Sequence, residues 1–209
     1  PNHPVIRRNT LVSLEYDPAV SDAERFSHAL DWGEWATAQA GGPHPRPRMR
    51  PLENRPLRIG YVSADFCQHT VGLFVKDLLM NHKPGRVTSF AYSAGKVNDR
   101  VTNSIRKACR WRDVSKLDDA ALANLIRQDE IDVLVDLSGH TAGSRLTAFA
   151  HRPASVQVSW LGYFATTGLA CMDAVLLDEW HAPQEMEKQF VEPIIRLPFG
   201  RFCYQPVPW

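Results

Sequence analysis

The sequence predicts an α/β fold in which helices cover both faces of a mainly parallel β-sheet. Two observations predict it: from Leu57 onward strand-like runs alternate with amphipathic helical patterns, and these runs are continuously apolar. A continuously apolar strand is buried on both faces, which is typical of a parallel sheet between two helical layers. With right-handed crossovers, this order of elements favours a Rossmann-like, doubly wound sheet.

The elements follow from local patterns of apolar residues and helix stops. Strands are expected at 57–63, 87–93, 110–114, 131–137, 155–161, 173–177 and 194–198, the last leading into an extended tail. Helices are expected at 71–81, 98–109, 117–128 and, more briefly, 145–150.

The N-terminal part has a different character. Ser21 and Glu24 form a capping-box pattern, and the residues that follow place one apolar face on a helix: Phe26, Ala29, Leu30 and Gly33. Residues 43–56 are rich in proline and lack periodicity. The sequence therefore divides into a helical linker with a proline-rich connector, 1–55, and a Rossmann-like lobe, 56–209. The apolar helix face must bury against this lobe or against an upstream element.

Composition excludes several classes. A net charge of +1 gives no general reason to expect nucleic acid or an anionic membrane as partner. Only 43–58 is locally basic, and we expect a solvated linker there. No apolar run approaches the ~20 residues that span a bilayer, and the N-terminus has no apolar signal core. Because the chain lacks an initial Met, we expect a piece of a longer protein.

The cysteines point to a reducing compartment. The chain has four, far apart and without a CxxC pair: Cys67, Cys109, Cys171 and Cys203. A zinc site or a disulfide framework is therefore disfavoured, and reduced thiols indicate a cytoplasmic protein.

Three loops that follow strands carry residues that could take part in binding or catalysis; they lie at 65–70, 138–143 and 162–168. Ligands of an open parallel sheet collect outside the carboxyl ends of its strands. His69 is interpreted as a base or hydrogen-bond partner, or else as a histidine that only caps a helix at the surface. His140 and Thr141 are interpreted as contacts to a sugar or phosphate, or else as loop residues that bond only to the backbone. Thr166, Thr167 and Gly168 let a ligand approach closely, or serve the turn alone.

Other chemistries are disfavoured in these loops. No G-x-G-x-x-G or Walker pattern follows the first strand, which disfavours nicotinamide and P-loop sites. There is no HExxH and no close ligand pair for a metal. Cys67 and His69 are too near in sequence to face each other as a nucleophile pair. Asp136 is interpreted as pinning the loop that follows it, and Arg152 as pinning the end of the sheet or as a helix C-terminal charge.

Two segments resemble a known family. PLRIGYVSADFCQHT, which begins at Pro56, and VDLSGHTAGSRLTAFAHRPASVQVSWLGYFATTGLACMD, which begins at Val135, resemble the catalytic region of O-linked N-acetylglucosamine transferases. The tail from Arg196 to Pro206 is similar to bacterial members, and the segment around Asn9 and Trp32 is similar to the linker that follows tetratricopeptide repeats in that family.

The resemblance implies a metal-independent, inverting glycosyltransferase of the GT-B type without a cofactor, which moves N-acetylglucosamine from UDP-GlcNAc to Ser/Thr hydroxyls of proteins. The chain would be the N-terminal lobe, with a nucleotide-gripping lobe after it, tetratricopeptide repeats before it, and no activity by itself. His69 matches a histidine proposed as base; His140 and Thr141 match a loop facing the sugar-diphosphate. Tyr163, Thr166, Thr167 and Gly168 belong to a third substrate loop, where Phe164-Ala165 replace the Pro-Gly of many members.

Two other functions stay open on the residues alone. A non-catalytic binding lobe of a repeat-containing scaffold protein would have the same fold. The hypothesis of a stand-alone nucleotide-binding protein has less support, because such a protein needs a phosphate-binding glycine loop or an acidic pocket that the sequence lacks.

Overall fold

The computed structural model describes residues 3–203, and in this part a seven-stranded sheet has the order β3-β2-β1-β4-β5-β6-β7. Every adjacent pair of strands is parallel, so the predicted Rossmann-like α/β fold is confirmed. The predicted tail beyond Cys203 lies outside the described residues. The strands are β1 Leu57–Ser63, β2 Val87–Ser93, β3 Arg110–Asp113, β4 Val133–Asp136, β5 Val156–Trp160, β6 Ala174–Leu177 and β7 Ile194–Arg196.

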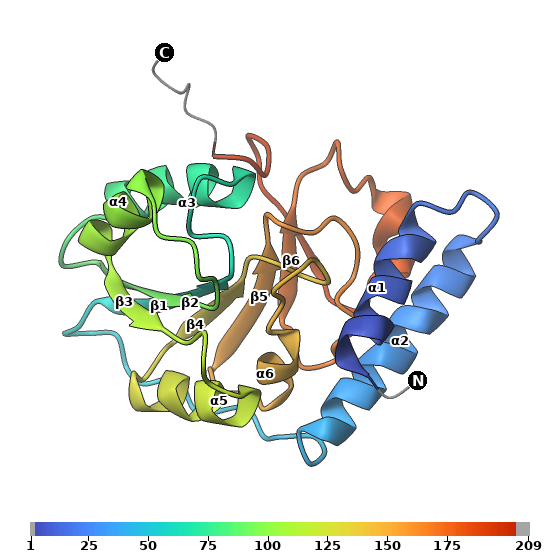
Figure 1. Cartoon of the computed structure of the whole chain (residues 1–209), viewed down its shortest axis with the longest axis horizontal. Helices are drawn as coiled ribbons and strands as arrows, with labels where there is room; N and C mark the ends of the chain where they lie inside the picture. Colours follow the sequence, from blue (N-terminus) through green and yellow to red (C-terminus); the bar gives the residue numbers. More distant parts are fainter. Residues whose placement is uncertain (1–2, 204–209) are drawn as a thin grey trace.

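Helices cover both faces of the sheet (Figure 1). They are α1 Pro4–Glu15, α2 Asp22–Gln39, α3 Thr70–Asn81, α4 Arg100–Ala108, α5 Asp119–Gln128 and α6 Leu146–Ala150, with a 3₁₀ helix, η1, at Gln184–Gln189. The predicted helices are confirmed to within two residues at each end, whereas η1, which buries none of its side chains, was not predicted.

The strands feed two cores by alternation along the pleat. On β1, Val62 packs with α5 and α6 in one core, whereas Tyr61 packs with α3 and α4 in the other. Leu134 and Val135 of β4 divide in the same way. Both faces of the central strands are thus apolar, which is why their sequences show no polar alternation.

The N-terminal helices dock on the sheet's α5–α6 side. The capping box of Ser21 and Glu24 is present at the start of α2. Leu11, Trp32 and Ala36 belong to the same core as Val62 and other sheet residues. The backbone of α2 lies so close to the 162–168 loop that a Cβ on Gly33 would be 1.8 Å from the Gly168 carbonyl oxygen. The helical linker is therefore held by contact between backbones.

The basic connector is exposed to half-buried, in keeping with the expected solvated segment, but it is not a free linker. Its arginines pair with acids at the edge of the sheet where strands begin, here called the amino edge. Arg55 donates to both carboxylate oxygens of Asp132 at 2.6 and 2.7 Å. Arg50 and Arg58 both reach Glu130, at 2.5 and 2.7 Å. The carboxylates that precede β4 hold the connector along this edge.

Arg152 pins the same edge. It donates to both oxygens of Asp173 at 2.8 Å, just before β6, and Asp173 also pairs with Arg46 of the connector. The first of the two interpretations of Arg152 is thus confirmed.

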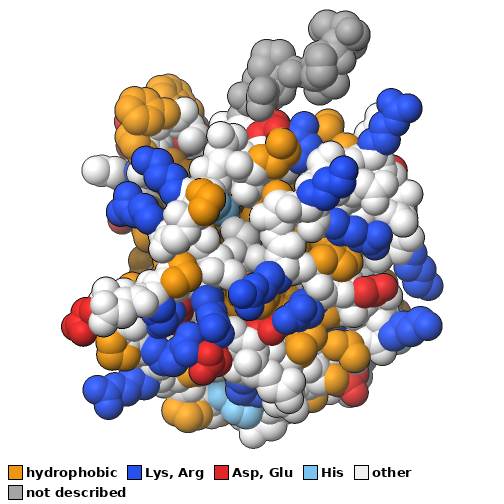
Figure 2. Space-filling model, turned by 90° about the vertical axis from the view of Figure 1, so that its left-hand side faces the viewer, with side chains coloured by type: hydrophobic (Ala, Val, Ile, Leu, Met, Phe, Trp, Pro, Cys, Tyr) orange, Lys and Arg blue, Asp and Glu red, His pale blue; other side chains and the backbone are white. Residues whose placement is uncertain are grey.

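The strand at one end of the strand order, β3, is a charged edge strand. Figure 2 shows lysines and arginines gathered on this side of the molecule, which carries β3 and α4. Arg106 lies over the ring of Trp111 at 4.7 Å, and Arg112 pairs with Asp129 at 2.7 Å. Charged side chains on an edge strand disfavour pairing with another chain. Within residues 3–203, no helix is long and apolar enough to cross a membrane.

We expect Gly33→Ala to destabilise the chain. In an open helix this change stabilises by about 1 kcal/mol, but here the new Cβ would meet the Gly168 carbonyl, and overpacking costs roughly 1–3 kcal/mol. Urea unfolding measures the difference. The matched control is Ser27→Ala, at an exposed position of the same helix, which should be neutral or slightly stabilising. A gain in stability for Gly33→Ala would contradict the close docking.

Candidate active site

The sheet reverses its winding direction between β1 and β4. From β1 the chain proceeds to β2 and β3 on one side, then returns to place β4 against β1 on the other. Loops after the two central strands therefore depart in opposite directions, which opens a crevice at their carboxyl ends. The loop after β1 carries His69, and the loop after β4 carries His140 and Thr141.

The three loops touch one another along the carboxyl edge, the edge where the strands end. A Cβ on Gly143 would lie 2.4 Å from the Ala64 Cβ, which joins the second loop to the first. A Cβ on Gly139 would lie 2.2 Å from the Tyr163 Cβ, which joins the second loop to the third. The structure thus brings the three predicted loops together, with glycine at each contact because a side chain would not fit.

His69 stands at the N-cap of α3. Its Nδ1 accepts a hydrogen bond from the Val71 backbone N–H at 3.3 Å, and an Asp65 carboxylate oxygen lies 4.0 Å from the same nitrogen. Its side chain is 50% exposed. Burial raises the pKa of Asp65, while the charge of His69 opposes that rise. His69 is therefore accessible and has two competing partners for one ring nitrogen.

Cys67 beside it is not an activated thiol. Burial, followed by the charges of Asp99 and Asp65, raises its pKa. A thiolate nucleophile needs a lowered pKa, so the expectation that Cys67 and His69 do not form a nucleophilic pair agrees with this environment.

Asp136 pins the second loop, as interpreted from the sequence. The carboxylate accepts hydrogen bonds from the backbone N–H groups of Ser138 and Gly139 at 3.2 and 2.8 Å, and from the Ser159 hydroxyl at 3.0 Å. Burial raises its pKa to about 6, although these hydrogen bonds favour the charged form. The carboxylate is fully enclosed, so its contacts are those of a structural support.

His140 lies beneath the surface. The side chain is 1% exposed, and the ring lies edge-on to Trp32 of α2 and to Tyr163, with centroids 4.5 and 5.3 Å away. Its Nε2 lies 3.0 Å from the Thr167 carbonyl oxygen. Burial lowers its pKa to about 4. The neutral ring therefore donates from Nε2 to that carbonyl and ties the second loop to the third.

Thr141, the next residue, is half-buried, and its hydroxyl donates to the Ser138 carbonyl at 2.7 Å. Within the second loop it is closer to the surface than His140.

The threonines of the third loop face inward. The Thr166 hydroxyl donates to Glu192 at 2.6 Å, and the Thr167 backbone N–H donates to the other oxygen of that carboxylate at 2.8 Å; the Thr167 hydroxyl also bonds Glu192. Gly168 has φ +74°, the left-handed region that favours glycine. Sequence reasoning missed Glu192, because it lies 25 residues beyond Thr167 and belongs to no local motif.

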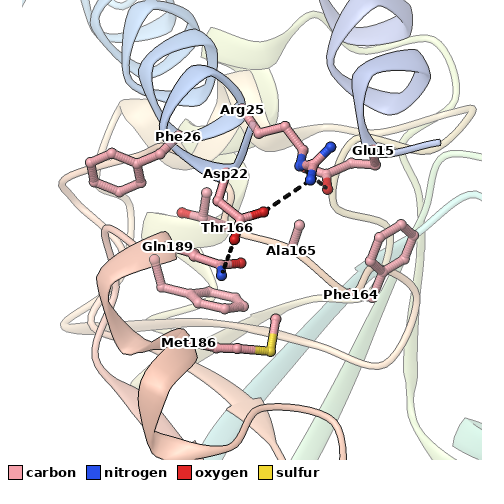
Figure 3. Close-up of a pocket in the computed structure, with 10 residues that line it drawn as sticks. Glu15, Asp22, Arg25, Phe26, Phe164, Ala165, Thr166, Met186 and Gln189 are labelled. Carbon is pink, nitrogen blue, oxygen red and sulfur yellow. Dashed lines mark hydrogen bonds and ion pairs between the residues drawn. The ribbon is translucent and has the colours of Figure 1, made fainter. Parts of the chain in front are cut away.

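A cavity of about 200 Å³ lies behind this loop (Figure 3). The end of α1 contributes Glu15, the start of α2 contributes Arg25, and η1 contributes Met186. Thr166 lines it, but neither His69 nor His140 does. The predicted site residues His69, His140 and Thr166 therefore do not share this cavity. Among residues 3–203, no group of three or more His, Cys, Asp or Glu side chains could hold a metal ion.

Comparisons with known proteins agree on one family. The family model described as "Glycosyl transferase family 41" matches residues 40–204. The chain is 35% identical over 211 residues to the probable UDP-N-acetylglucosamine–peptide N-acetylglucosaminyltransferase SPINDLY of Arabidopsis thaliana, covering 96% of this chain and 22% of that protein. It is 35% identical over 151 residues to the protein SEC of the same plant, which carries the same description; the match covers 71% of this chain and 15% of SEC.

A solved structure is also closely similar. The O-GlcNAc transferase of Thermobaculum terrenum, as its K341M mutant, superposes with a TM-score of 0.92 at 34% identity, covering 99% of this chain and 40% of that one. The chain spans about a fifth of the length of SPINDLY and less of SEC. The family match, the sequence relatives and the shared fold lead to one conclusion: this chain belongs to glycosyl transferase family 41.

Proposed function

We propose that the protein containing this chain transfers N-acetylglucosamine from UDP-GlcNAc to serine or threonine hydroxyls of proteins, with inversion and without a metal. The observation that carries the proposal is the accessible His69, on the loop after β1, beside the loop after β4 at the point where the sheet reverses. The names of the relatives supply the donor and the acceptor class.

In the proposed reaction the acceptor oxygen attacks the anomeric carbon, the bond to UDP breaks, and the hydroxyl proton passes to a base. Positioning and stabilisation of the leaving diphosphate would supply most of the acceleration. His69 can accept the proton only with a lone pair on Nε2. With Nδ1 accepting from Val71 N–H, the neutral ring carries its proton on Nε2 and donates there.

Asp65 supports the alternative tautomer. Its carboxylate, 4.0 Å from Nδ1, would accept a proton placed on that nitrogen and so free the Nε2 lone pair. We therefore propose that His69 acts as base when Nδ1–H turns to Asp65 and as a hydrogen-bond donor when it bonds Val71.

The remaining predicted residues form the wall beside His69. Thr141 would contact the sugar-diphosphate, whereas His140, Thr166 and Thr167 support the wall from behind through their buried hydrogen bonds. Gly168 is buried against α2 and would belong to the same support. Tyr163 would bridge the second and third loops by its contact with Gly139.

The opposite wall would come from a second lobe. The chain spans 40% of the similar solved transferase and 22% of its plant relative, so a nucleotide-binding lobe and upstream repeats are proposed for the whole protein. By itself this chain should then show no transfer. All four cysteines are free, which supports a cytoplasmic location.

We expect His69→Ala in the full-length protein to lower the rate of transfer from radiolabelled UDP-GlcNAc by about 10²–10⁴-fold, because a general base contributes about that much. The matched control is His28→Ala, on an exposed position of α2, which should keep the wild-type rate. Chelator should leave the wild-type rate unchanged. No transfer by the wild-type protein, with no thermal shift on adding UDP, would favour a binding lobe of a scaffold protein.

A second prediction concerns pH. The pKa of His140 is lowered from its ordinary 6.5 to about 4, so below pH 6.5 the unfolded chain binds a proton that the folded chain does not. The stability that neutral His140 contributes is present above that pH and is lost as pH falls toward 4, by up to about 1.4 kcal/mol per pH unit.

His140→Gln removes this titration. The free energy of unfolding of the wild-type chain minus that of the variant should therefore be larger at about pH 7.5 than at about pH 5. Asp136 titrates in both proteins, so its opposite effect cancels in the difference. Urea unfolding at both pH values measures it, and a constant difference would show that His140 is not buried as a neutral ring.

A further inference from the structure

Two buried side chains of opposite charge hold the third loop from the segments on either side of β7. Glu192 precedes this strand and Arg201 follows it. They are 3% and 6% exposed, respectively. Neither belongs to a loop that the sequence singled out.

Glu192 holds the C-terminal half of the loop. Its carboxylate accepts from the Thr166 and Thr167 hydroxyls and from the Thr167 backbone N–H. The Thr166 hydroxyl in turn accepts from the Gly168 N–H at 3.1 Å. One carboxylate thus sets the direction of both threonines and of the backbone that reaches Gly168.

Arg201 holds the N-terminal half. Its guanidinium donates to the Leu161 and Tyr163 carbonyls at 3.1 and 3.2 Å. The guanidinium also lies over the ring of Phe202 at 4.7 Å, and that ring stacks on Phe74 of α3 at 5.2 Å. The backbone of Arg201 is itself fixed, since its N–H donates to Asp178 at 2.8 Å.

The loop needs such support. Leu161 has φ +76°, a left-handed conformation that a leucine rarely adopts. Such backbone persists only where its surroundings over-determine it, and it gathers at functional sites. Burying two charges is costly unless they are hydrogen-bonded, and an apolar pair would pack at lower cost. What the charges add is a defined position for loop carbonyls, N–H groups and hydroxyls.

We propose that Glu192 and Arg201 are positioning residues for the transfer reaction, holding the third loop as a rigid wall against which the substrates are aligned. The inference rests on the proposed function. Neither side chain needs to touch a substrate: each acts through the loop, Glu192 through Thr166 and Thr167, and Arg201 through Leu161 and Tyr163. Small displacements of such a wall are expensive, because misplacement by about 1 Å can cost about 10²-fold in rate.

The experiment compares Glu192→Gln and Arg201→Met with a matched control, Asp132→Asn, in the full-length protein. Asp132 is also a buried, arginine-paired carboxylate that accepts a backbone N–H, but its partners are Arg55 and Arg58 rather than residues of the third loop. Thermal unfolding identifies a temperature at which all four proteins are folded, and kcat and KM for UDP-GlcNAc and for an acceptor peptide are measured there.

We expect Glu192→Gln and Arg201→Met to lower kcat/KM by about tenfold or more, while Asp132→Asn loses thermal stability with kcat and KM within about twofold of wild type. Thr167→Val provides a second test that keeps the carboxylate. Combined with Glu192→Gln it should cost less than the sum of the two single effects, because both act on one contact.

Two outcomes separate the hypotheses. If the wild-type protein transfers sugar and Glu192→Gln retains its kcat/KM, or loses it only in proportion to the unfolded fraction as Asp132→Asn does, the positioning role is wrong and the proposed function stands. If the wild-type protein transfers no sugar, the proposed function fails and the positioning role fails with it.

Discussion

Close packing of three glycines against neighbouring segments is the constraint on which the rest of the site depends. Gly139 and Gly143 let the second loop lie directly against its neighbours, and Gly33 lets α2 lie against the third loop. A Cβ at any of these points would overlap another residue at less than 3 Å. Because packed interiors have no spare volume, the loops and the linker helix share one arrangement. This packing positions the loops that carry His69, His140 and Thr166.

Charge is used differently at the amino edge and behind the second and third loops. At the amino edge, arginines of the connector meet the buried Asp132 and the exposed Glu130. The exposed pairs contribute little stability each while directing the path of the chain. Behind the second and third loops, Asp136 and Glu192 are enclosed and accept several hydrogen bonds each. A buried carboxylate is tolerated only when its oxygens are satisfied. These two carboxylates therefore fix the geometry of the loops, whereas the ion pairs of the amino edge attach the connector to the sheet.

The two histidines have different roles because they differ in burial. His69 and His140 both follow central strands, yet one is half exposed and the other is sealed under Trp32 and Tyr163. Burial keeps His140 neutral, so its ring works as a fixed link to the Thr167 carbonyl. His69 keeps access to solvent and a choice between Val71 and Asp65 for Nδ1. That choice is what a proton acceptor at this position would need.

The fold could be read from the sequence because burial of a strand on both faces leaves a continuous apolar run, as in 57–63, and because the Ser21–Glu24 pattern caps a helix wherever it occurs. The three loops could be placed at one edge, since parallel strands end on the same side. Local sequence patterns do not show which distant residues a side chain will contact. The roles of Glu192, Arg201 and the connector arginines, and the burial of His140, could therefore be seen only in the folded chain.

The sequence by itself determined the layers, the strands and the loops that carry the chemistry. Tertiary structure decided which side chains stay accessible and which hold the wall in place, because accessibility and long-range hydrogen bonding depend on packing between segments that the chain brings together only when it folds.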